Sequence, residues 1–348
     1  MVRELVHHGY RVRACIRDAN SWRGADCVDY LGKLPNVEVI DGCDLFTAGS
    51  YDRAFKGAAA VFHVAAVLGN SADGKSQPLG TGDIARDVYE GGLIGTKNVI
   101  DSVNKSGSVA RLLYTSSMAA VSGAKGAALP QGYEWTEEDW SSDDVEDLEW
   151  GKPHNSYSKS KVDTERFINQ CAAESGGQWD AVSMNPAMIC GPILFKAQVG
   201  QWIEQIGRLA GGFEPAWPSK YDMYYNIIDV RDLVKAHRLA AESEVDHVSS
   251  LGGSRYIMHG SGGRSALRLG TEIAELIEDH FPSFVLGEPA TVTDKGKLVK
   301  VESRHVNDSK KARSVLGATF RSSGETVRDL IESFLELGVM TPRLKEAS

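Results

Sequence analysis

Residues 59–66 have the sequence Ala-Ala-Val-Phe-His-Val-Ala-Ala, a continuous apolar run of strand length. Parallel strands that are covered by helices on both faces show such runs, because neither face meets water. A segment with helical spacing of apolar residues follows at about 83–104, and a second strand-like run follows it at 111–116. We therefore expect a strand, a helix and a second parallel strand, which is the βαβ unit of an α/β protein.

The same alternation extends along most of the chain. Further strands are predicted at 10–16, 36–40, 180–186 and 255–258, and further helices at 2–6, 155–173, 230–241, 271–280 and from Ser322 to Gly338. The last helix begins with the capping box Ser322-x-x-Glu325. The pattern predicts a Rossmann-like, doubly wound parallel sheet with a smaller C-terminal lobe.

The domain boundaries follow from where the alternation stops. It breaks after Gly191-Pro192, in a stretch rich in aromatic residues and glycine. We expect a dinucleotide-binding domain made of residues 1–190, to which 226–260 return. Residues 191–225 and 261–348 are expected to form the substrate-binding lobe.

Composition narrows the class of protein. The chain has 348 residues, 42% of them hydrophobic and 24% charged, and a formal net charge of −9. This acidic balance argues against nucleic acid or an anionic membrane as a partner, and no apolar run approaches the roughly 18 residues of a membrane span. The five cysteines have no metal-binding spacing, so we predict no metal and reduced thiols in a cytoplasmic protein.

The strongest chemical signal is Tyr157-Ser-Lys-Ser-Lys161 at the start of a predicted helix. The i, i+4 spacing puts the phenol and the ammonium on one helix face. We expect Lys161 to lower the pKa of Tyr157 from about 10, so that the phenol can exchange a proton near neutral pH. Ser117 lies 40 residues upstream at the end of a predicted strand, where α/β sheets place their ligands. It could hydrogen-bond a carbonyl oxygen that Tyr157 protonates.

These motifs resemble the extended short-chain dehydrogenase/reductase family, and within it the dihydroflavonol-reductase-like and cinnamoyl/aldehyde-reductase-like branch. The segments that carry the resemblance are Val12–Asp18, Gly42–Leu45, Val61–Ala66, Tyr114–Ser117, Tyr157–Lys161 and Asn185–Pro192. Their order and spacing cover nearly the whole chain. The resemblance implies that Ser117, Tyr157 and Lys161 are the catalytic triad. His63 is expected to be a packed strand residue.

The resemblance also implies a set of cofactor contacts. Tyr157 and Lys161 are expected at the nicotinamide ribose, and Asp44 and Leu45 at the adenine. The strand end at Val64, Ala65 and Ala66 would pass the cofactor, and Pro186, Ala187, Met188 and Ile189 would form the nicotinamide wall. Arg17 stands where an acid commonly binds the ribose of NAD, and an arginine there accommodates the 2′-phosphate of NADP. We therefore predict NADP(H) as the cofactor, although Asp18 follows directly.

The leading hypothesis is NADPH-dependent reduction of a small aldehyde or ketone to the alcohol, a reaction of the kind found in secondary metabolism. A small carbonyl compound would be the partner, and the protein would be a monomer or homodimer. Met118-Ala119 stand where family dehydratases tend to carry an acidic pair, and Gly91-Gly92 where sugar epimerases tend to carry an asparagine. Both differences favour a plain carbonyl reductase. The alternatives are a truncated, cofactor-impaired non-catalytic homologue, and an epimerase or hydroxysteroid-type dehydrogenase on the same fold.

One expected element is missing from the sequence. Dinucleotide folds open with a strand and a glycine-rich turn that leads into a helix, whereas this sequence starts at the helix. The missing strand would be central, between the strands at 10–16 and 59–66. We expect either that these two strands pair directly or, as the favoured alternative, that the sequence is an incomplete version of a longer protein. Both outcomes predict impaired cofactor affinity.

Overall fold

The computed structural model describes residues 1–67, 83–122, 133–141, 153–213, 224–244, 255–260, 267–268, 272–287, 306–307 and 309–346. Its centre is a parallel four-stranded sheet in the order β10-β6-β4-β3. The strands are β3 (Ala60–His63), β4 (Arg111–Thr115), β6 (Asp180–Pro186) and β10 (Arg255–Met258). Because all four run the same way, their carboxyl ends meet at one edge of the sheet.

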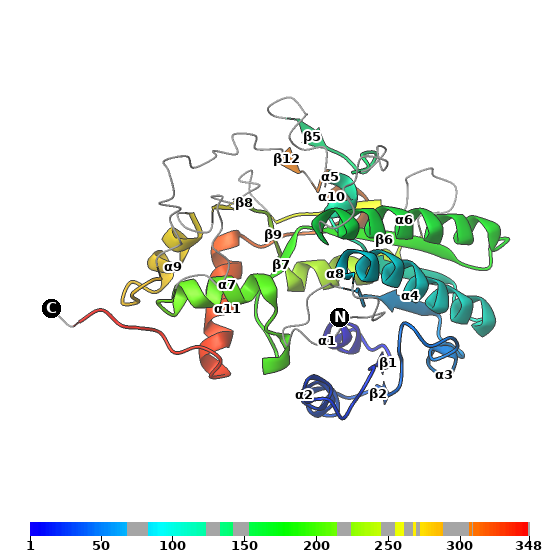
Figure 1. The fold of residues 1–348 in the computed structure, drawn as a ribbon, viewed down its shortest axis with the longest axis horizontal. Helices are drawn as coiled ribbons and strands as arrows, with labels where there is room; N and C mark the ends of the chain where they lie inside the picture. The colour runs from blue at the N-terminus through cyan, green and yellow to red at the C-terminus, as the bar shows by residue number, and fades with distance from the viewer. Residues whose placement is uncertain are drawn as a thin grey trace.

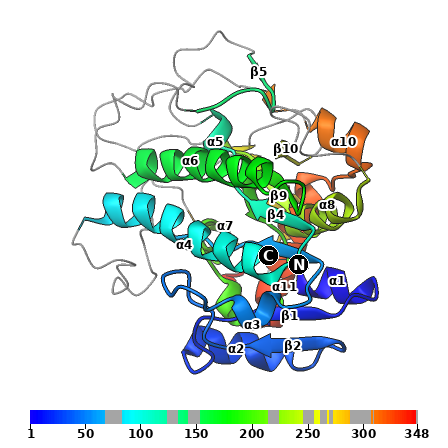
Figure 2. The same cartoon turned by 90° about the vertical axis from the view of Figure 1, so that its right-hand side faces the viewer.

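Helices cover both faces of this sheet (Figure 2). Leu112 of β4 packs in one core with α4 (Ile84–Ser106) and α6 (Pro153–Glu174). The next residue, Leu113, packs in a second core with α8 (Val230–Glu242) and α10 (Lys310–Leu316). Successive strand residues point to opposite faces. The continuous apolar runs in the sequence are therefore explained by burial on both sides.

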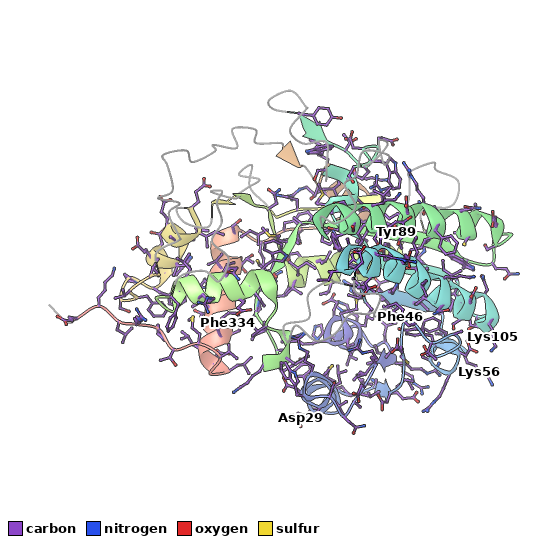
Figure 3. The ribbon with its side chains drawn as sticks, in the orientation of Figure 1. Asp29, Phe46, Lys56, Tyr89, Lys105 and Phe334 are labelled. Carbon is purple, nitrogen blue, oxygen red and sulfur yellow. The ribbon has the colours of Figure 1, made fainter. Side chains whose placement is uncertain are left out.

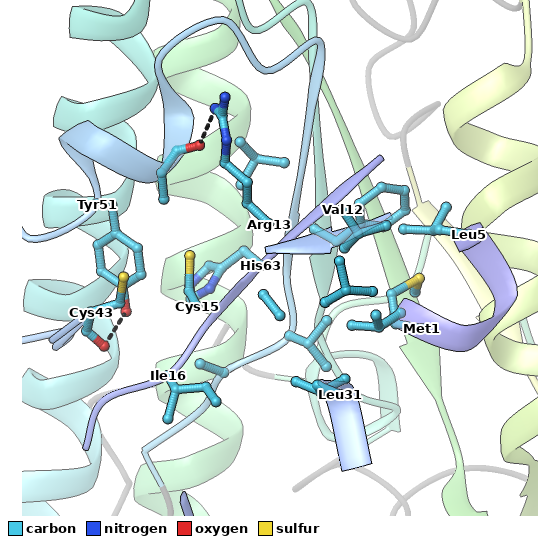
Figure 4. A pocket seen from close by; sticks show the side chains of 18 of the residues that line it. Met1, Leu5, Val12, Arg13, Cys15, Ile16, Leu31, Cys43, Tyr51 and His63 are labelled. Carbon is cyan, nitrogen blue, oxygen red and sulfur yellow. Dashed lines mark hydrogen bonds between the residues drawn. The ribbon is translucent and has the colours of Figure 1, made fainter. Parts of the chain in front are cut away.

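The N-terminal strands form a separate unit. β1 (Val12–Cys15) pairs in parallel with β2 (Val37–Ile40), and α1 (Val2–His7), α2 (Trp22–Leu31) and α3 (Asp52–Phe55) belong to the same part of the chain. In the described residues β1 has no pairing with β3, and a cavity of about 1530 Å³ lies between them, lined by residues of both strands (Figures 1 and 4).

Direct pairing of these two strands, one of the two expected outcomes, is therefore wrong. Contacts that Glu4 and Tyr10 make with α8 explain the position of the β1–β2 unit. Glu4 accepts a hydrogen bond from Arg238 of α8 at 2.9 Å, and Tyr10 donates one to Glu242 of the same helix at 2.8 Å. These contacts attach the β1–β2 unit to α8 and leave the space beside β3 open.

A third core lies in the C-terminal part. It joins β7 (Met188–Cys190), its parallel partner β9 (Ile227–Asp229), α7 (Gln201–Ala210), α9 (Ala274–His280) and α11 (Ser323–Glu336). Phe334 of α11 packs so closely on Gly207 of α7 that a Cβ atom there would lie 2.4 Å from its ring (Figure 3). The division into two domains stays a prediction, and α10 of the C-terminal segment packs with the central sheet.

The short elements complete the description: η3 (Lys196–Gln198), α5 (Ala119–Ser122), the antiparallel pair β8 (Tyr224–Tyr225) and β11 (Leu267–Arg268), and the parallel pair β5 (Glu134–Trp135) and β12 (Val306–Asn307). The predicted cap of the last helix is confirmed, since Ser322 Oγ accepts the Glu325 amide at 3.2 Å. Helices α2, α3, α5, α7 and α10 were not predicted. Within the described ranges, no helix combines the length and the apolar character that crossing a membrane requires.

Candidate active site

Ser117 lies two residues beyond the end of β4, at the carboxyl edge of the sheet. Its carbonyl accepts a hydrogen bond from Asn185 Nδ2 at 3.2 Å, and the Met118 amide donates to the Pro186 carbonyl at 2.9 Å. Ser117 Oγ accepts a hydrogen bond from the Ala119 amide at the start of α5, at 3.1 Å. The backbone around Ser117 is thus held between β4, β6 and α5, which fixes the direction of its hydroxyl.

Tyr157 and Lys161 come from the first half of α6, one helical turn apart. The hydroxyl of Ser117 lies close enough to the Tyr157 phenol to favour its ionised form. The buried Lys161 amine lies 5.7 Å from the centre of the Tyr157 ring. The structure therefore brings together the alcohol, the phenol and the amine that the sequence singled out.

The electrostatics differ from the expectation. Burial raises the pKa of Tyr157 above its usual value, and the Ser117 hydroxyl partly opposes this. The expected lowering of the Tyr157 pKa is therefore wrong, because burial outweighs any stabilisation of the phenolate by Lys161. The Lys161 amine itself donates to Tyr114 Oη at 3.1 Å and to the Thr115 carbonyl at 3.0 Å. Burial lowers the pKa of Lys161 to about 8, against an opposing contribution from Glu165.

A small cavity reaches this group of side chains. Its wall contains Leu45, His63, Ala65, Ala66, Val67, Gly92, Thr96, Tyr114, Tyr157, Ser160 and Lys161. The first five of these residues also line the large cavity between β1 and β3. The two spaces therefore adjoin along the end of β3, and a ligand lying in the large cavity could reach Tyr157 and Lys161.

Half of the predicted cofactor residues, those at Arg17, 44–45 and 64–66, line the large cavity. Arg17 and Asp44 follow the ends of β1 and β2, and Leu45 lies beside Asp44. Residues 64–66 are exposed to the cavity where the chain leaves β3, with Val64 at 48% exposure. Asp44 also closes its own turn, because Oδ1 accepts the Phe46 amide at 2.8 Å.

The predicted nicotinamide wall is not part of this arrangement. Among the described residues, Pro186, Ala187, Met188 and Ile189 line neither of these two cavities. Pro186 and Ala187 are buried, and Ile189 is 38% exposed. The segment does lie beside Ser117, through the bond between Met118 and Pro186. Its role toward a cofactor stays a prediction.

Two side chains near the amine were not assigned a role. Tyr114 accepts the hydrogen bond from Lys161, and its position in the segment Tyr114–Ser117 was the only signal in the sequence. His63 packs on Tyr114 with ring centres 5.4 Å apart. Burial, with Lys161 adding to it, lowers the pKa of His63 to about 3, so the ring is neutral. In the described ranges no group of three or more His, Cys, Asp or Glu could hold a metal ion.

The sheet, its helical layers and the hydroxyl–phenol–amine group at its carboxyl edge define a Rossmann-like α/β protein with a Ser–Tyr–Lys site. The chain belongs to the NAD dependent epimerase/dehydratase family, whose model matches residues 1–252. The predicted membership of the extended short-chain dehydrogenase/reductase group is confirmed by this match.

Several individual proteins similar to this chain are reductases by name. Anthocyanidin reductase of Arabidopsis thaliana is 28% identical over 251 residues, which are 70% of this chain and 68% of that protein. Cinnamoyl-CoA reductase CAD2 of Medicago truncatula is 26% identical over 339 residues, 97% of this chain and 91% of that protein. The crystal structure of Gre2 in complex with NADPH from Candida albicans has a TM-score of 0.73 at 22% identity, covering 97% of this chain and 94% of that one. This similarity confirms the Rossmann-like fold class.

Proposed function

We propose that the protein is an NADPH-dependent reductase that converts a small aldehyde or ketone to the alcohol. Carbonyl reduction as a class is supported by the names of the relatives, and NADPH by the Gre2 complex. The observation that carries the proposal is that Ser117, Tyr157 and the buried Lys161 lie together at the carboxyl edge of the sheet, with Tyr157 and Lys161 in the wall of the small cavity that adjoins the large one. The choice of substrate, the cytoplasmic location and the monomeric or homodimeric state stay predictions.

The residues that line the cavities suit a dinucleotide. Arg17, whose side chain is exposed, would hold the 2′-phosphate. Asp44 and Leu45 would lie at the adenine, and the exposed chain at 64–66 leaves room for the cofactor to pass because Ala65 and Ala66 have small side chains. When bound, NADPH supplies the hydride that reduces the carbonyl carbon.

The chain's own residues supply the proton and orient the substrate. Because burial raises the pKa of Tyr157, its phenol is protonated at neutral pH and can donate to the carbonyl oxygen. Ser117 would hold that oxygen with a second hydrogen bond. Lys161 has a pKa of about 8 and carries a positive charge at neutral pH, which stabilises the negative charge left on Tyr157 after proton transfer.

The test compares Tyr157→Phe with Tyr89→Phe. Tyr89 (labelled in Figure 3) is a matched control because its phenol donates a hydrogen bond to Asp163 at 2.8 Å. Tyr89 is not among the described residues that line the small cavity. NADPH oxidation is followed with a panel of aromatic and aliphatic aldehydes and ketones. We expect Tyr157→Phe to lower kcat by about 100-fold or more, while Tyr89→Phe stays close to the parent.

NADPH binding is measured separately by fluorescence titration. We expect Tyr157→Phe to bind NADPH only a few-fold more weakly than the parent, because Lys161 would still hold the nicotinamide ribose and the main role of the phenol is at the carbonyl oxygen. If Tyr157→Phe turns over as fast as the parent, the assigned role of Tyr157 is wrong. If the parent binds no NADPH at micromolar concentrations, the cofactor-impaired, non-catalytic alternative is favoured.

A further inference from the structure

A buried carboxylate lies one helical turn beyond Lys161 and takes no part in the chemistry above. Glu165 of α6 and Arg255 of β10 are both fully buried, and Arg255 Nε donates to Glu165 Oε2 at 2.7 Å. The other carboxylate oxygen, Oε1, accepts from Asn185 Nδ2 at 2.7 Å and from the hydroxyl of Ser116. One side chain thus connects α6, β10, β6 and the end of β4.

Arg255 extends this connection beyond the sheet. Its Nη1 donates to the carbonyls of Glu137 and Asp139 at 2.8 and 2.7 Å, and its Nη2 donates to the Ala120 carbonyl of α5 at 3.3 Å. The guanidinium also lies 3.7 Å from the centre of the Trp140 ring. The carbonyl groups that accept these Arg255 bonds belong either to α5, which follows Ser117, or to the segment 137–139, which leads to Ser141 and its hydrogen bond with α5.

Stability is a weak reason for such an arrangement. A buried ion pair loses so much hydration that apolar residues of similar volume often stabilise a protein equally well or better. In this network both oxygens of Glu165 and all three guanidinium nitrogens of Arg255 are hydrogen-bonded, whereas Asn185 Oδ1 has no partner. Buried hydrogen bonds of this kind specify one arrangement of the segments that they join. Asn185 bonds both Glu165 and the Ser117 carbonyl, so the carboxylate is two hydrogen bonds away from the backbone of Ser117.

We infer that Glu165 is a positioning residue of this site: through Ser116, Asn185 and Arg255 it fixes the segment that carries Ser117 relative to Tyr157 and Lys161. The inference rests on the proposed function for its catalytic consequence. The structural consequence, a fixed chain from Ser116 to Ala120, stands independently of any activity.

The charges around the amine make the role of Glu165 measurable. The groups that face Lys161 or Glu165 are Tyr157 on α6, His63 on β3, Tyr114 on β4 and Arg255 on β10. Glu165 opposes the effect of burial on the Lys161 pKa. Without this carboxylate, Lys161 loses its proton at a lower pH, because nothing then opposes the effect of burial in this way.

The experiment compares Glu165→Gln with Asp180→Asn. Asp180 is a matched control because it also pairs with an arginine between β4 and β6, with both Arg111–Asp180 distances at 2.6 Å, but at the amino ends of the strands. We expect Glu165→Gln to lower kcat about 10-fold or more with little change in the NADPH Kd. The alkaline limb of the kcat profile should move to lower pH by about one unit. Asp180→Asn should lower thermal stability without either change.

Hydrogen exchange followed by mass spectrometry supplies a readout that needs no activity. The amides of Ser116, Met118 and Ser141 are bonded to the Met184, Pro186 and Ala120 carbonyls at 2.8, 2.9 and 3.0 Å. We expect faster exchange in peptides that contain these amides in Glu165→Gln, and parent-like exchange there in Asp180→Asn. If the parent reduces no carbonyl compound, the proposed function fails while the exchange data still decide the positioning role.

Glu165→Asp covers the case in which the glutamine variant does not fold. It keeps the negative charge on a shorter side chain, so we expect a reduced kcat with an alkaline limb close to that of the parent. The inference is overturned if Glu165→Gln matches Asp180→Asn in kcat, pH profile and exchange. If only the aspartate variant folds, parent-like kcat and exchange in that variant overturn it.

Discussion

The contact between α4 and α6 depends on a glycine next to the site. A Cβ atom at Gly92 of α4 would lie 2.1 Å from Ser160 Oγ of α6 and 3.5 Å from Ser160 Cβ. Ser160 is buried and precedes Lys161, and all three residues line the small cavity. We predict that Gly92→Ala displaces the Ser160 hydroxyl and so disturbs the packing of the two helices that bring Tyr157 and Lys161 to the sheet.

The magnitude follows from two opposing effects. Alanine is more favourable than glycine inside a helix by about 1 kcal/mol, whereas overpacking a closed contact costs about 1–3 kcal/mol. Gly92→Ala should therefore destabilise the protein by about 0–2 kcal/mol. In a Ser160→Ala background the hydroxyl is absent, and the nearest Ser160 atom is the Cβ at 3.5 Å, an ordinary contact. There the same change should stabilise by about 1 kcal/mol, because only the helical preference remains.

The assay is a double-mutant cycle measured by urea unfolding of the parent, Gly92→Ala, Ser160→Ala and the double variant. The coupling free energy between the two positions should be about 1–3 kcal/mol. The kcat of Gly92→Ala should fall and should recover in the double variant. A coupling below about 0.5 kcal/mol, the limit for independent sites, would refute the claim that the Ser160 hydroxyl closes the contact between the two helices at Gly92.

Two further predictions concern the cofactor and pH. Arg17→Ala should raise the NADPH Kd about 10- to 100-fold, the loss of one or two charge-assisted bonds, and leave the NADH Kd unchanged; equal losses for both nucleotides would contradict the assignment of the 2′-phosphate. Burial lowers the pKa of His237 to about 4 and of His63 to about 3, so both rings are neutral in the folded protein. Because the unfolded chain takes up these protons first, the free energy of unfolding should fall below pH 6.5, by about 2 kcal/mol per histidine at pH 5. Urea midpoints measured from pH 7 to 5 check this, and His237→Gln should flatten the slope.

Local patterns determined the elements of this protein and part of its site. The boundaries of β6 agree with the predicted strand at 180–186, and the Ser322 cap was visible three residues from its partner. The i, i+4 spacing of Tyr157 and Lys161 likewise placed both on one turn of α6. Such signals depend on residues within about one helical turn or along one strand, so the sequence alone carries them.

Contacts between distant segments decided the rest. Lys161 is directed to Tyr114 and Thr115, and burial raises the Tyr157 pKa, opposite to the expectation from the spacing alone. The partners Glu165 and Arg255 are 90 residues apart in the chain. The open space between β1 and β3 likewise reflects how the N-terminal unit attaches to α8. Desolvation and long-range pairing depend on which surfaces are buried against each other, and only tertiary packing fixes that.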